Sequence, residues 1–130
     1  MARADRFATH VFRTAGIYGL IALLPQYLIE AGIGPPLPAP LTRPEHFYGF
    51  IGVAVAWQLV FLVIARDVRR YRLLMLPAIV EKLSFGIPVW LLFFKQRVGV
   101  DVVVFGSIDL LLGVLFVLAY RATREQGRAV

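Results

Sequence analysis

The sequence predicts an all-α membrane protein, an antiparallel bundle of four transmembrane helices. Apolar residues make up 59% of the 130-residue chain and charged residues 17%, with a mean hydropathy of +0.74, whereas soluble domains are about half apolar. The apolar residues gather in four stretches, each close to the roughly 20 residues that a helix needs to cross a bilayer. Short polar or proline-rich segments separate these stretches. We therefore treat residues 1–130 as a single integral-membrane domain.

The first predicted transmembrane segment covers residues 12–30. Pro25 interrupts it and removes one backbone hydrogen bond from a helix. Ala15, Gly16 and Gly19 form a patch of small residues that suits close contact with another helix. The basic start resembles a signal peptide, but no small-residue cleavage site follows the apolar stretch. We expect a retained first helix.

The second predicted segment covers residues 47–65 and follows the proline-rich residues 31–43, which favour an extended loop. Thr42 and Glu45 have the spacing of a capping box, so we expect them to cap the start of this helix. Gln58 lies near the middle of the segment. Amides at this depth commonly form hydrogen bonds between helices, which is the role that we expect for Gln58.

The third predicted segment covers residues 73–94, and the short basic turn at 66–72 makes it antiparallel to the second. Glu81 and Lys82 lie near its middle, where a charge costs about 2.5 to 3.5 kcal/mol on insertion scales. Such charges need partners within the bundle. Because successive helical residues point about 100° apart, we expect Glu81 and Lys82 to have different partners.

The fourth predicted segment covers residues 100–120, with Asp109 almost at its midpoint. Gly99, Gly106 and Gly113 repeat at intervals of seven residues, a spacing that permits close left-handed packing against another helix. Asp109 lies on the same face as these glycines. We therefore expect Asp109 to face protein rather than lipid, and the polar residues after 120 to fray.

Basic residues predict the orientation in the membrane. Ten of the 14 Lys and Arg residues lie before or early in the first segment, between the second and third segments, or after the fourth. Cytoplasmic segments carry such an excess, so both termini are predicted to lie in the cytoplasm, with the chain in the inner (plasma) membrane. The net charge of +6 is then explained by anionic lipid headgroups, and we expect no nucleic-acid partner.

Four polar residues on three segments fall within roughly 10 Å of the predicted midplane, and they are the candidate binding or proton-exchange residues: Gln58, Glu81, Lys82 and Asp109. One interpretation is structural: Lys82 pairs with Asp109, and a protonated Glu81 bonds to Gln58 or a tyrosine. A second is that Glu81 exchanges a proton during a transport or lipid-binding cycle. A third is that the cluster forms the head of a cavity for an amphiphile, with walls from Trp57, Phe85 and Trp90.

The sequence contains no nucleophile elbow, phosphate-binding loop or HExxH motif, and no Cys. We therefore predict no cofactor and no metal site, and favour a binding or accessory protein over an enzyme. A small proton-linked transporter and a lipid or sterol-like isomerase that uses buried carboxylates stay open as alternatives. Expected partners are membrane lipids and a small amphiphilic ligand, with a homo-oligomer or a larger membrane complex also open.

Short stretches of the chain carry a resemblance to a known layout: EHFYGF at 45–50, RYRLLM at 70–75 and EK at 81–82. With the four predicted helices, they resemble small uncharacterised bacterial inner-membrane proteins of DoxX-like layout. The resemblance implies a bacterial four-helix membrane protein and no established chemistry. Small multidrug exporters also have four short helices, but their acidic site lies in the first helix, and residues 12–30 have no acid near the midplane.

Overall fold

The computed structural model describes residues 2–32 and 43–128, and across them the chain forms four α-helices and one short 3₁₀ helix. In chain order these are α1 (Arg3–Glu30), α2 (Pro44–Arg66), η1 (Arg72–Leu74), α3 (Met75–Phe94) and α4 (Val100–Arg128). Each of the four described α-helices is long and apolar enough to cross a membrane. The predicted all-α four-helix fold is confirmed, and it indicates a multi-pass membrane protein.

The first and last helices extend beyond their predicted bounds. α1 begins at Arg3 rather than near residue 12, because Ala8 and Val11 are buried and the early turns pack against protein. Pro25 is contained within α1. α4 continues to Arg128, so the tail is helical where we expected fraying. The helical ends thus extend the bundle beyond the purely apolar stretches.

At the start of α2 the described residues include Glu45 but not Thr42, the other member of the predicted capping box. Arg43 precedes the helix and no side chain caps it, while Pro44 occupies the first turn as its fixed φ angle favours. Glu45 pairs with Arg43, at 3.2 Å between Oε1 and Nε. Thr42 and most of the predicted proline-rich loop lie outside the described residues.

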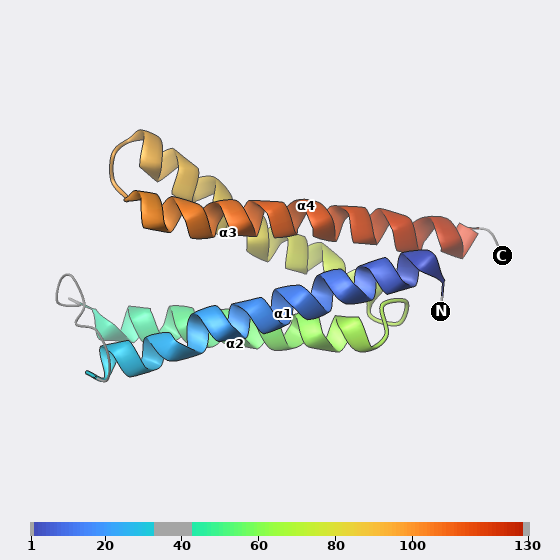
Figure 1. The fold of residues 1–130 in the computed structure, drawn as a ribbon, viewed down its shortest axis with the longest axis horizontal. Helices are drawn as coiled ribbons and strands as arrows, with labels where there is room; N and C mark the ends of the chain where they lie inside the picture. The colour runs from blue at the N-terminus through green and yellow to red at the C-terminus, as the bar shows by residue number, and fades with distance from the viewer. Residues whose placement is uncertain (1, 33–42, 129–130) are drawn as a thin grey trace.

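The helices form two antiparallel hairpins, α1 with α2 and α3 with α4 (Figure 1). α1 also packs on α4 and joins the hairpins, whereas α2 and α3 have little contact although they follow each other in the chain. The start of α1, the end of α4 and the loop between α2 and α3 lie at the same end of the molecule (Figure 1), which we call the basic end. The hairpins diverge toward the opposite end.

Small residues bring the helices of each hairpin together, as predicted. A Cβ atom on Gly16 would lie 2.9 Å from the backbone oxygen of Gln58, so α1 can approach α2 only without a side chain there. In the other hairpin, a Cβ atom on Gly86 would lie 2.9 Å from the backbone oxygen of Gly106. These close approaches fix the spacing within each hairpin.

The glycine stripe of α4 is confirmed in part. A Cβ atom on Gly106 would lie 2.7 Å from Val89, and one on Gly113 would lie 3.4 Å from the Cβ atom of Lys82, so both glycines face α3. Gly99 precedes α4, and a Cβ atom on it would meet only Asp101. The stripe therefore begins inside the helix.

The hydrophobic core fills the half of the bundle nearer the basic end. Three fully buried phenylalanines, one from each of α1, α2 and α4, form its centre: Phe12, Phe61 and Phe116. Phe12 stacks on Phe116 with 4.2 Å between ring centroids, and Phe61 meets Phe116 edge-on at 5.0 Å. Met75 and Ala78 of α3 complete this core. All four helices are thus packed together at this level.

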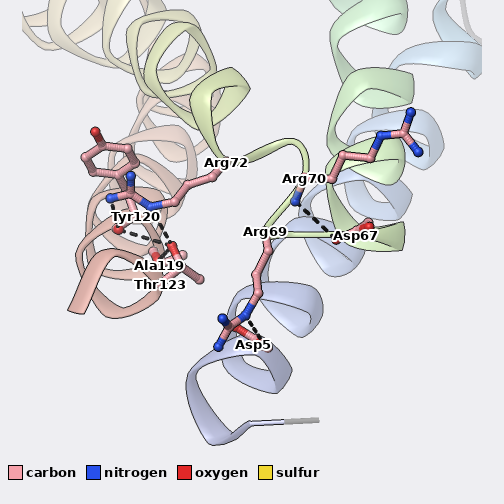
Figure 2. A network of polar contacts seen from close by, with 8 residues as sticks. All are labelled: Asp5, Asp67, Arg69, Arg70, Arg72, Ala119, Tyr120 and Thr123. Carbon is pink, nitrogen blue, oxygen red and sulfur yellow. Dashed lines mark hydrogen bonds and ion pairs between the residues drawn. The ribbon is translucent and has the colours of Figure 1, made fainter. Parts of the chain in front are cut away.

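Two loop arginines tie this end together (Figure 2), and we call Arg69 and Arg72 the arginine clasp. Arg69 Nε donates to Asp5 Oδ2 at 2.8 Å and so reaches the first turn of α1. Arg72 Nη2 donates to the Tyr120 carbonyl at 2.7 Å, and its Nε donates to Thr123 Oγ1 at 3.1 Å. The Arg72 guanidinium carbon also lies 3.7 Å from the centroid of the Tyr120 ring. Contacts that we had assigned to lipid headgroups are therefore made, for these two arginines, with α1 and α4.

Candidate functional site

A cavity of about 650 Å³ lies between the two hairpins, in the half of the molecule away from the basic end. This volume is in the range of sites for small molecules. All four helices contribute to the lining, and most of the walls are apolar side chains: Ala22, Leu23, Ile29, Phe47, Phe50, Ala54, Phe85, Val102 and Phe105. The hydrophobic core occupies one half of the bundle, and this cavity occupies the other.

Lys82 is buried where the core meets the cavity, with 2% of its surface exposed. Its Nζ lies 3.4 Å from Asp109 Oδ1 on α4, so the predicted ion pair between the third and fourth helices is present. The same Nζ lies 3.6 Å from Glu81 Oε2 and 5.1 Å from the centroid of the Phe61 ring. One ammonium group thus serves two carboxylates.

Glu81 and Lys82 contact each other, while among the described residues only Lys82 pairs with Asp109, so the two have different partners beyond this contact. Their Cα–Cβ bonds diverge around the helix, but the long side chain of Lys82 bends back toward Glu81. At 3.6 Å the contact exceeds hydrogen-bond length, and Glu81 Oε2 has no hydrogen-bond partner. The structural interpretation predicted a hydrogen bond from Glu81 to Gln58 or to a tyrosine. No such bond is present among the described residues.

Gln58 also differs from its expected role. Its Nε2 donates to the carbonyl of Ala54 at 2.8 Å, within α2 rather than to another helix. Its Oε1 is buried and has no hydrogen-bond partner. Gly19 of α1 makes room for this amide, because a Cβ atom there would overlap it. Gln58 thus lines the cavity, but its unused acceptor lies behind the cavity surface, against Gly19.

The three predicted pocket-wall residues lie in three different places. Phe85 lines the cavity. Trp57 lines a second hollow of about 630 Å³ between α2 and α3, which we call the α2–α3 groove. Trp90 lines neither, and its Nε1 donates to Ser107 Oγ of α4 at 3.1 Å. Trp90 is thus a link between α3 and α4, because its indole finds a partner on the adjacent helix.

The cavity and the α2–α3 groove share four lining residues: Phe50, Ala54, Glu81 and Phe85. The rings of Phe50 and Phe85 lie 6.4 Å apart between centroids and bridge α2 and α3, the two helices that otherwise have little contact. Glu81 lines both hollows because its face of α3 includes Pro77 and Ser84, which line the groove, rather than Ala78 and Gly86, which are buried.

Tyr18 and Asp101 are polar lining residues that were not among the sequence candidates. Tyr18 of α1 lines the cavity, as Asp109 of α4 does. Asp101 in the first turn of α4 lines it nearer the end away from the core. Tyr18 lies three positions after Ala15, so it shares a helix face with that member of the small-residue patch. This proximity to the small-residue patch was the available sequence evidence for it.

The lining carries more negative than positive groups. Glu81, Asp101 and Asp109 contribute carboxyl groups, and Lys82 contributes the single basic side chain among the described lining residues. Within residues 2–32 and 43–128, no three His, Cys, Asp or Glu side chains are grouped so that they could hold a metal ion. The arrangement can hold a polar or charged group beside an apolar body. Comparison with models of protein families, with curated proteins and with solved structures finds no match for this chain.

Proposed function

We propose that the chain is an integral-membrane binding protein for a small amphiphile. The apolar part of the ligand would lie against the walls of the cavity, and its polar group would reach Gln58, Glu81, Lys82 and Asp109. The observation that carries this proposal is the cavity itself, because its apolar walls lead to a buried group of polar side chains. Pockets with a few convergent polar groups in an apolar lining are typical of small-molecule sites.

A second candidate function is proton-linked transport of the same ligand. Glu81 lines both the cavity and the α2–α3 groove, so its carboxyl group faces two spaces. The basic end, in contrast, is filled by the phenylalanine core and held by the arginine clasp. A carboxyl group that is reached from one half of a bundle and sealed from the other suits one state of a transport cycle.

We also propose the location and orientation. The excess of Lys and Arg at the basic end supports placing both termini in the cytoplasm. The DoxX-like resemblance adds support for the inner membrane of a bacterium. In this orientation the cavity lies in the outer half of the membrane, and its ligand would enter from the outer leaflet or from the space beyond it.

The test is binding of decyl amphiphiles to the protein in lipid nanodiscs, measured by calorimetry against empty nanodiscs. The probes are decanol, decanoate and decylammonium, which share one tail. Ala22→Phe fills the cavity from its half-buried position on α1 and should abolish saturable binding. Ala56→Phe is the matched control, since Ala56 is exposed on α2 and lines neither hollow. If no probe binds saturably, or if both variants bind like the original chain, the proposal is wrong.

A further inference from the structure

We infer that the ligand of the cavity is a hydrogen-bond-donating cation, an amphiphile that carries a primary or secondary ammonium group. This inference rests on the proposed binding of an amphiphile. It specifies the polar group of the ligand, and two features of the lining lead to it: an excess of carboxylates, which also accept hydrogen bonds, and aromatic walls.

The lining offers carboxyl groups as hydrogen-bond acceptors. Gln58 is 2% exposed and its Oε1 has no hydrogen-bond partner, and Glu81 Oε2 has none either. Gln58 Nε2 donates one hydrogen bond to Ala54 and Gln26 Nε2 donates one to the carbonyl of Ala22 at 3.1 Å, so each amide group keeps one further N–H. Lys82 lies between two carboxylates. The two unpartnered oxygens are buried behind the surface of the cavity, so a ligand that donates hydrogen bonds would use the carboxyl groups that line it, on Glu81, Asp101 and Asp109.

The charge of the lining favours a cation. Lys82 is the single positive group, and Asp109 and Glu81 both lie within 4 Å of it. An anionic ligand would have to compete with these carboxylates for Lys82 and would then lie beside them at close range. A cationic ligand near Glu81 would instead balance the second negative charge, because the ammonium group of Lys82 balances only one of the two carboxylates.

Aromatic side chains line the rest of the cavity, including Phe47, Phe50, Phe85 and Phe105. The faces of aromatic rings attract ammonium groups, more strongly where water is excluded. The same rings bury the alkyl part of an amphiphile. The walls therefore suit a lipophilic amine along its whole length.

The experiment compares decylammonium with decanol, decanoate and decyltrimethylammonium in the same nanodiscs. We expect decylammonium to bind most tightly, and decyltrimethylammonium to bind less tightly because it is charged but cannot donate. Glu81→Gln should weaken binding of decylammonium by about tenfold, the loss of one charged hydrogen bond, and leave decanol unchanged. This variant keeps the Lys82 pair with Asp109. Glu45→Gln is the matched control, since Glu45 lies outside the cavity.

The outcomes separate this inference from the proposed function. If decanoate or decanol binds most tightly, the proposed binding of an amphiphile stands, and the inference that the ligand is a cation is wrong. If Glu81→Gln weakens all probes equally, Glu81 supports the fold and does not recognise the ligand, and the inference again fails. Absence of binding by every probe rejects the proposed function itself.

Discussion

Lys82 is the only basic residue among the described lining residues, and it contacts two carboxylates at once. Removing either member of an ordinary buried ion pair strands one charge. Here the two sides are unequal: loss of Asp109 leaves Lys82 with Glu81, whereas loss of Lys82 leaves two carboxylates facing each other. The geometry thus ranks the substitutions.

We predict that Lys82→Met destabilises the protein more than Asp109→Leu. Stranding a buried charge costs about 3 to 5 kcal/mol in soluble proteins, and Lys82→Met should lie at the upper end of that range. The double variant should recover part of the loss, because the Lys82–Asp109 interaction is then absent on both sides. Thermal unfolding in one detergent measures all three variants.

A second double variant, Glu81→Gln with Lys82→Met, is the matched control, because it removes the other carboxylate that contacts Lys82. It should also lose less stability than Lys82→Met alone. Equal losses for Lys82→Met and Asp109→Leu would contradict the shared contact. Strictly additive losses in the double variant would show that the two groups have separate partners.

At the scale of helices, the contact between α3 and α4 depends on glycines. A leucine at Gly106 would push against Val89, which lies 2.7 Å from the position of the added Cβ atom. We predict that Gly106→Leu lowers the melting temperature and more strongly than Leu112→Ala, because it separates two backbones rather than leaving a local cavity. Gly49→Leu on α2 is the matched control, since nothing lies within 4 Å of a Cβ atom there. Unchanged stability of Gly106→Leu would place this face of α4 toward lipid.

The arginine clasp gives a prediction for the loop between α2 and α3. Arg72→Ala removes two hydrogen bonds to α4 and a stacked contact with Tyr120. Hydrogen bonds of a charged group contribute about 1.5 to 3 kcal/mol, so we expect a loss of that size in the free energy of unfolding. Arg70→Ala is the matched control, because its exposed side chain reaches only the ring of Tyr71, at 5.5 Å. Equal effects of the two substitutions would contradict the clasp.

The helices and the Lys82–Asp109 pair could be predicted from the sequence because composition, helical rise and depth in the bilayer determine them. The shared contact with Glu81 could not, because it depends on the side-chain conformation of Lys82. The bond from Gln58 to its own helix could not either, since it depends on how closely Gly19 lets α1 approach. The clasp was missed because basic residues beside a membrane segment are also attracted to headgroups, and charge counts do not distinguish these roles.

At the scale of the whole molecule, one half is packed and the other is hollow. The phenylalanine core and the clasp hold all four helices at the basic end, while the α1–α2 and α3–α4 hairpins diverge toward the opposite end (Figure 1). The hairpins keep their internal contacts because glycines lie between their helices. Contact between α2 and α3 in the hollow half includes the rings of Phe50 and Phe85. The position of the cavity is therefore a consequence of where the chain places its glycines and phenylalanines.

The proposed orientation yields the last prediction, which concerns the two ends of the molecule. The chain has no Cys, so a single introduced cysteine reports its own exposure to a membrane-impermeant maleimide. Arg70 lies in the loop at the basic end, and Lys95 follows α3 at the opposite end; both are exposed. Because cytoplasmic segments carry the excess of Lys and Arg, Lys95→Cys should be labelled in intact bacterial cells, and Arg70→Cys only after permeabilisation. Labelling of Arg70→Cys in intact cells, with protection of Lys95→Cys, would reverse the orientation and place the cavity in the cytoplasmic half. Labelling of both in intact cells would contradict the passage of α3 across the membrane.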